Sequence, residues 1–158
     1  MSPIYFSRLL LILALCATAA CGAKPESNSG GDAYRHVAAP MVLDDWNDGQ
    51  LAYGEGDRTD WKKFELDQAA KVYLTLSVDK EDSGVELACY NRVGVPMGTV
   101  TKKEGTSGEV RLVMTAPSDG LYFIKVQATG GEPTSYSLRA SLSADSDSRS
   151  NNSALPDF

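Results

Sequence analysis

Histidine and cysteine are scarce in this chain, and their scarcity argues against most catalytic and metal chemistries. The 158 residues include one histidine, His36, and three cysteines, Cys16, Cys21 and Cys89. A zinc site needs a cluster of these two residue types. A Ser–His–Asp triad needs a histidine held in a rigid position, and His36 lies in a segment rich in small polar residues. We therefore expect a protein that is not an enzyme.

The chain also lacks a basic patch and a long apolar run. Acidic residues outnumber basic ones by 21 to 15, the net charge is −6, and no cluster of cations exceeds Lys102-Lys103. Such a surface repels phosphate groups, which argues against nucleic-acid binding. The longest apolar run, residues 9–17, is much shorter than the roughly 20 residues that a membrane-spanning helix needs.

The short apolar run is followed by Thr18-Ala19-Ala20-Cys21-Gly22. This order is typical of a bacterial lipoprotein signal peptide, over residues 1–20, with the Cys21 thiol carrying the acyl chains (palmitate among them). Each buried methylene contributes ~0.8 kcal/mol, so two or three chains anchor a protein firmly. Gly22, in place of an aspartate, favours the outer membrane. The alternative is an ordinary secretory signal cleaved near Ala20.

Two flanking segments have no apolar periodicity. Residues 21–40 are rich in Gly, Ser, Asn, Ala and Pro, which predicts a flexible tether from Cys21. Residues 143–158 are rich in Ser, Asp and Asn, which predicts a disordered tail. With both removed, the folded domain is expected over residues 41–142.

Within residues 41–142, apolar and polar residues alternate with the period of two that is typical of half-buried strands. The clearest runs are residues 72–79, 110–114, 122–127 and 136–140. Turn-forming Gly, Asp, Pro and Ser residues separate them at intervals of ~8–12 residues. This pattern predicts an all-β, antiparallel sandwich. Residues 64–71 are expected to form a strand and then a turn, with a short helical turn as the alternative. Cys89 alternates with Val85 and Leu87, so we expect it to be buried.

Five motifs in this order resemble the bacterial pre-peptidase C-terminal (PPC) domain. They are residues 54–64 (GEGDRTDWKKF), 71–76 (KVYLTL), 85–94 (VELACYNRVG), 116–126 (APSDGLYFIKV) and 135–140 (SYSLRA). The resemblance implies a jelly-roll-like β-sandwich of about eight strands. Some members of that family bind collagen or polysaccharide, and some bind calcium.

A group of acidic residues surrounds the start of the predicted domain. Calcium takes six to eight oxygen ligands, commonly carboxylates and carbonyls on loops. The spacing here is not that of an EF-hand, so solvated acids at turns and strand ends are the alternative to calcium. The candidate ligands are Asp44, Asp45, Asp48, Asp57 and Asp60.

Both tryptophans lie close to these acids. Trp46 falls outside the main alternation and is a candidate ligand-binding residue, because exposed aromatic rings flanked by polar groups stack on sugar rings. Trp61 is expected to close the core, which is its role in the family that the chain resembles.

Together these features predict a lipid-anchored, non-enzymatic binding or assembly module of the bacterial cell envelope. Its partner would be an envelope protein or a polysaccharide. The alternatives are a calcium-dependent adhesion or matrix-binding module and an accessory subunit of a larger envelope complex. No cofactor other than calcium is predicted.

Overall fold

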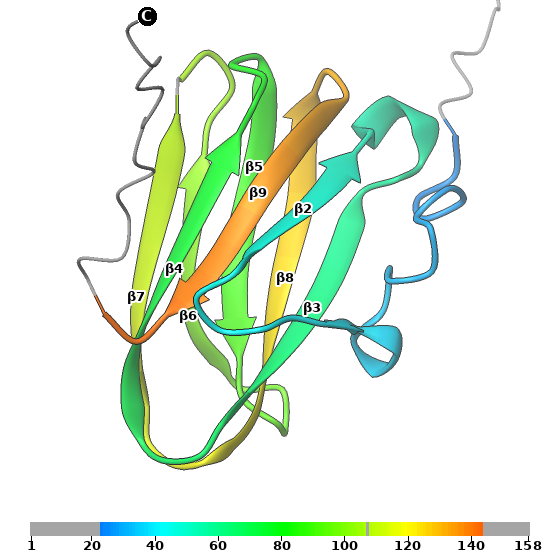
Figure 1. Ribbon diagram of the computed structural model, residues 1–158. Helices are drawn as coiled ribbons and strands as arrows, with labels where there is room; N and C mark the ends of the chain where they lie inside the picture. The colour runs from blue at the N-terminus through cyan, green and yellow to red at the C-terminus, as the bar shows by residue number, and fades with distance from the viewer. Residues whose placement is uncertain (1–22, 107, 144–158) are drawn as a thin grey trace, which may run out of the picture.

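The alternating pattern of the sequence forms β-strands through most of residues 23–106 and 108–143, which the computed structural model describes (Figure 1). The strands are β1 (Ala39–Pro40), β2 (Trp46–Leu51), β3 (Thr59–Leu66), β4 (Ala70–Val78), β5 (Ser83–Tyr90), β6 (Pro96–Lys102), β7 (Glu109–Ala116), β8 (Gly120–Gly131) and β9 (Thr134–Ser141). The helical segments in these ranges are two short 3-10 turns, η1 (Arg35–Val37) and η2 (Tyr53–Glu55). No helix in the same ranges is long and apolar enough to cross a bilayer.

The strands form two sheets, in the orders β1-β3-β8-β5-β6 and β2-β9-β4-β7. All neighbours pair antiparallel except β1, which runs parallel to β3. The predicted all-β sandwich is therefore confirmed. The segment over residues 64–71 is also as predicted, since β3 ends at Leu66 and β4 begins at Ala70 after a turn.

The core lies between the sheets, where one side chain in two points inward, as the pleat of a strand requires. Val72, Leu74 and Leu76 on β4 are fully buried, and Ile124 and Val126 on β8 lie in the same cluster. Cys89 is also fully buried, as predicted. The hydrophobic core thus holds the two sheets together without a disulfide among the described residues.

The two open sides of the sandwich are closed differently. On one side β6 contacts β7. On the other side lie β2 and β3, and here residues 23–40, which we call the strap, run beside β3 (blue in Figure 1). Ala39 and Pro40 pair with Lys62 and Lys63 of β3.

The strap corrects the prediction of a flexible tether. Its described residues pack on the domain: Ala33 and Ala38 are buried, and the Trp61 amide donates to the Asp32 carbonyl over 2.8 Å. The Lys62 ammonium pairs with the Asp32 carboxylate at 2.9 Å. Small and polar residues are held here by hydrogen bonds and by this ion pair, which leave no apolar period in the sequence.

Three of the predicted segments lie largely or wholly outside the described residues. They are the signal peptide over residues 1–20, the lipidated Cys21 and, apart from Ser143, the tail over residues 143–158. These remain predictions.

Candidate functional site

The outer face of the four-stranded sheet carries the predicted binding residue Trp46. Gly49 lies against the Tyr136 ring and Leu51 is buried, so the alternate residues of β2 point outward. Each outward residue of β2 is opposite an outward residue of β9. The pairs are Trp46 with Arg139, Asp48 with Ser137, and Gln50 with Ser135. The part of the face formed by β2 and β9 is therefore polar, with an indole at one end of the edge strand β2.

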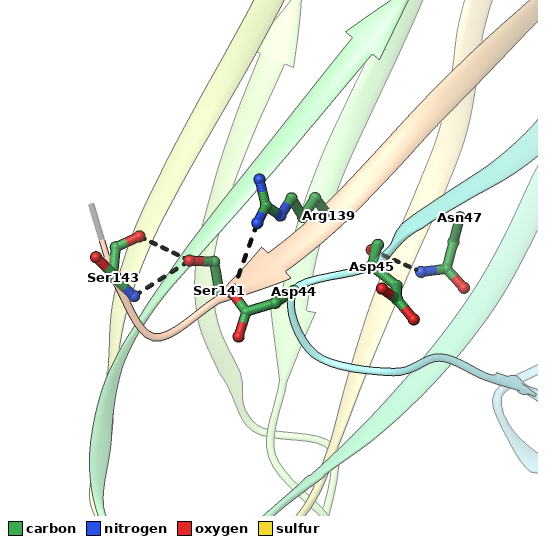
Figure 2. A network of polar contacts seen from close by, with 6 residues as sticks. All are labelled: Asp44, Asp45, Asn47, Arg139, Ser141 and Ser143. Carbon is green, nitrogen blue, oxygen red and sulfur yellow. Dashed lines mark hydrogen bonds and ion pairs between the residues drawn. The ribbon is translucent and has the colours of Figure 1, made fainter. Parts of the chain in front are cut away.

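The Arg139 side chain joins the indole to a carboxylate. Its guanidinium carbon lies 5.8 Å from the centroid of the Trp46 ring. One of its terminal nitrogens lies 3.8 Å from Asp44 Oδ1 (Figure 2). The Asp44 amide donates a hydrogen bond to the Ala140 carbonyl over 2.8 Å, which positions Asp44 beside β9. The φ of Asp44 is +67°. Figure 2 also shows Asp45 between Asp44 and Asn47, where its carbonyl accepts from the Asn47 side chain over 3.1 Å.

A shallow hollow of about 510 Å3 lies on the same face, where β2 and β9 run side by side. Its polar side chains come from Asp48, Gln50, Asp79, Ser135 and Ser137. The Ser137 hydroxyl donates to Asp48 Oδ1 over 2.6 Å. This arrangement offers hydroxyl, amide and carboxylate groups on the same two strands as the Trp46 ring, which suits a polyhydroxylated ligand.

A second group of acids lies on the open side, beneath the strap. Asp60 is only 5% exposed, and the Tyr136 hydroxyl donates to its Oδ2 over 2.5 Å. Burial raises the pKa of Asp60 to about 7, and the nearby negative charges of Asp32 and Asp57 act in the same direction. The pKa of Asp57 is also raised. The largest cause is burial, and the negative charges of Asp32, Glu26 and Glu55 add to it in that order.

Beside these acids is a hollow of about 460 Å3, open to solvent, between β2, β3 and the strap. Asp57 Oδ1 is buried without a hydrogen-bond partner. The Asp32–Lys62 ion pair lines the same hollow. Lys62 thus offsets the negative charge of Asp32. Asp60 reduces the repulsion among the carboxylates in another way, because its raised pKa favours the neutral, protonated form.

The five predicted calcium ligands do not form one site. Asp44 and Asp45 lie on the loop before β2, Asp48 lies on the outer face, and Asp57 and Asp60 lie beneath the strap. Among residues 23–106 and 108–143, no three His, Cys, Asp or Glu side chains are placed to hold a metal ion together. Calcium binding by this chain remains a prediction.

Trp61 differs from its predicted place. Phe64 and Leu66 point inward, so the odd-numbered residues of β3 point outward, and Trp61 is only half-buried. Its ring lies 5.3 Å from that of Tyr90 on the outer face of the five-stranded sheet. Each sheet therefore carries one tryptophan on its outer face.

The candidate catalytic groups are poorly placed for chemistry. His36 lies on the strap and stacks on Tyr34. Burial raises the pKa of the Cys89 thiol to about 12, so the thiolate that a nucleophile requires is not formed near neutral pH.

Sequence reasoning missed Arg139, Ser137 and Tyr136. A signal existed for the first two, since each occupies a polar position between apolar residues of the last predicted strand. No local signal pointed to Tyr136, because its partner Asp60 is 76 positions away.

We compared the chain with known proteins and found similarity in structure alone. No family model matches the sequence, and no curated protein matches it. The fold is similar to the pre-peptidase C-terminal domain of a collagenase from Bacillus anthracis, with a TM-score of 0.55 and 16% identity over 65% of this chain and 93% of that one. It is also similar to CorA, a surface-associated copper-binding protein of Methylomicrobium album BG8, with a TM-score of 0.51 and 10% identity over 67% and 98%. The chain therefore has a PPC-like β-sandwich fold.

Proposed function

We propose that this protein is a non-enzymatic binding module of the bacterial cell envelope, which binds polysaccharide on the outer face of its four-stranded sheet. The observation that carries the proposal is the row of Trp46, Arg139 and Asp48 beside a polar hollow. An aromatic ring supplies apolar contact area for the face of a sugar, and the neighbouring polar groups orient its hydroxyls.

Three features support a binding role over a catalytic one. The hollow is shallow and lies on a rigid sheet rather than in a walled cleft. Burial suppresses ionisation of the Cys89 thiol. His36 stacks on Tyr34 of the strap. Some PPC domains bind collagen or polysaccharide, and the similarity of fold supports a binding role here as an analogy.

Retention on polysaccharide tests the proposal, with the two tryptophans as a matched pair. We expect Trp46→Ala to abolish retention of the protein on purified peptidoglycan sacculi or capsular polysaccharide. Trp61→Ala, on the opposite outer face, should be retained like the wild type. Equal retention of both variants would remove the assignment of this face. Circular dichroism on each variant checks that the sandwich is intact.

The location in the envelope rests on the lipid anchor predicted at Cys21. One acyl chain alone binds a bilayer reversibly, whereas two or three chains on Cys21 would hold the protein there stably. The Gly22 that follows favours the outer membrane. Labelling of cells with radioactive palmitate tests this: the wild type should be labelled and Cys21→Ser should not. An unlabelled wild type would leave the secretory alternative.

A protein partner from the envelope, or a place in a larger envelope complex, follows from the same anchor. Crosslinking in cells, with recovery of the protein through the folded domain, distinguishes these alternatives from polysaccharide binding. A single stoichiometric protein partner that is retained in Trp46→Ala would favour the assembly role.

Calcium-dependent binding is the other alternative, and thermal melting tests it. A ligand present at 100 times its Kd stabilises the folded state by ~2.7 kcal/mol. A difference of less than about one degree between melting temperatures in EDTA and in millimolar calcium would exclude a stabilising calcium site.

A further inference from the structure

The strap is bound to the domain from its first described residue. The Ala23 amide donates to the Gly54 carbonyl over 3.4 Å, and the Ala23 carbonyl accepts from an Arg58 guanidinium nitrogen over 3.4 Å. The backbone of Lys24 passes so close to Gly56 that a Cβ there would overlap it. The chain thus leaves the domain beside η2, at the start of β3.

Further contacts hold the next residues of the strap. The Glu26 carboxylate accepts from the Thr59 amide over 3.2 Å and from the Thr59 hydroxyl over 2.8 Å. The Asn28 side chain donates to the Glu55 carbonyl over 2.5 Å. With the Asp32–Lys62 ion pair, polar contacts fix the strap at several points.

This docking shortens the distance between the domain and any lipid on Cys21. Cys21 is two residues before Ala23, and consecutive Cα atoms are about 3.8 Å apart, so the two Cα atoms lie within ~8 Å. A free tether of residues 21–40 would instead reach roughly 20–25 Å. The lipid would therefore hold the η2 end of the sandwich close to the bilayer surface.

We infer that the Tyr53–Arg58 pair, beside the point where the strap begins, contacts the headgroup layer of the membrane. This inference rests on the acylation of Cys21 that the proposed function contains. In this arrangement the domain lies directly on the bilayer surface instead of at the end of a long flexible tether. The loops at its other end are directed away from the bilayer.

The chemistry of the pair suits this position. Tyr53 is exposed at 36%, and the guanidinium carbon of Arg58 lies 4.2 Å from the centroid of its ring. Arg58 Nε also donates to the Tyr53 carbonyl over 3.0 Å, which holds Arg58 against η2. Tyrosine rings are enriched at the membrane–water interface. Arginine can donate there to lipid phosphates.

The strand register defines the end that faces away. Thr59 is opposite Gln127 at one end of the five-stranded sheet, whereas Tyr90 is opposite Phe123 toward the other. The loop after Tyr90 therefore lies at the end remote from Arg58. It includes Val93, which is exposed at 72%.

Tryptophan fluorescence in vesicles tests the orientation. The full-length lipidated protein, with Trp46→Phe and Trp61→Phe, receives a single new tryptophan by Tyr53→Trp or, as the control, by Val93→Trp. Both variants are reconstituted into phosphatidylcholine vesicles whose acyl chains are partly brominated. We expect severalfold stronger quenching for Tyr53→Trp than for Val93→Trp. Circular dichroism checks that both are folded.

The outcomes separate this inference from the proposed function. Protein that floats with the vesicles but shows equal quenching at both positions overturns the inference and leaves the anchor standing. Protein that does not float overturns the anchor and the inference together. A second variant that loosens the strap, Glu26→Ala with Asp32→Ala, should still float but lose the excess quenching of Tyr53→Trp; unchanged quenching would show that strap docking does not set the orientation.

Discussion

The Tyr136 hydroxyl on β9 donates a hydrogen bond to the buried carboxyl of Asp60 on β3 over 2.5 Å. This bond joins the two sheets on the side that the strap covers. Gly49 makes it possible, because a Cβ at that position of β2 would overlap the Tyr136 ring. The pair thus lies at the meeting point of both sheets, below the hollow lined by the strap.

Asp60 should make the stability of the protein depend on pH. Its pKa is about 7 in the folded protein against 3.8 ordinarily, so between these values the folded state retains a proton that the unfolded state releases. The stability that Asp60 contributes is fully present below pH ~4 and is lost as the pH rises toward 7. Over this range the free energy of unfolding should fall by up to about 1.4 kcal/mol per pH unit. We expect Asp60→Asn to remove it. Urea denaturation of both proteins between pH 4.5 and 8 measures the difference, and parallel profiles would contradict this assignment.

Tyr136→Phe should destabilise the protein by about 1–3 kcal/mol, because the buried Asp60 carboxyl loses its hydrogen-bond donor. The loss should be greater at pH 8 than at pH 5, since a hydrogen bond to the ionised carboxylate is stronger than one to the neutral acid. Denaturant unfolding at both pH values measures it. Tyr73→Phe is the control, because Tyr73 is a half-buried tyrosine on β4; a similar loss in the control would mean that the Asp60 bond contributes little.

Lys102 is a buried cation whose neighbours are backbone carbonyls. Its side chain is almost fully buried, and Nζ donates to the carbonyls of Glu81 and Ser83 over 2.8 and 2.9 Å. Lys102→Met keeps most of the stem but removes the Nζ donor from both carbonyls, of which that of Glu81 still accepts from the Gly105 amide. This loss should cost about 1–3 kcal/mol. The exposed neighbour provides the control, since Lys103→Met should change the free energy of unfolding by less than about 0.5 kcal/mol. Equal unfolding midpoints for the two variants would refute the role of Lys102.

The strands were predictable because their signal is local. Val72, Leu74 and Leu76 recur every second residue, and the burial of one face enforces that alternation. The family resemblance predicts Trp61 in the core, whereas the phase of β3, which Phe64 and Leu66 define, places it on the outer face.

The strap and the acidic residues were harder to predict, because their environment depends on distant parts of the chain. Asp48 and Asp60 are the same residue type on neighbouring strands in the sandwich, yet Asp48 is exposed and Asp60 is buried. The pleat points Asp48 outward from β2 and Asp60 inward from β3, but it does not reveal their partners. These are Ser137 for Asp48 and Tyr136 for Asp60, both on β9 and distant in the sequence. The composition of the strap, rich in Gly, Ser and Asn, likewise does not indicate the carbonyl contacts and the Asp32–Lys62 ion pair that hold it.

The strap should detach when its Glu26 contact is lost. Glu26 accepts both the amide and the hydroxyl of Thr59, so Glu26→Ala leaves the amide at the start of β3 without its acceptor and frees the first turn of the strap. We expect faster hydrogen exchange at the amides of Thr59 and Trp61, the second of which donates to Asp32 of the strap. Exchange in the β5–β8 ladder should stay unchanged, because local opening leaves the core intact.

Glu65→Ala is the matched control for this experiment, since Glu65 is an exposed acid on the same strand. Its exchange pattern should equal that of the wild type. If Glu26→Ala also left exchange at Thr59 and Trp61 unaltered, the carboxylate would not be what holds the strap. The backbone contacts of Ala23 and the parallel pairing of β1 with β3 would then be sufficient to dock it. Protection that falls at Thr59 but not at Trp61 would place the hinge of the strap between Glu26 and Asp32.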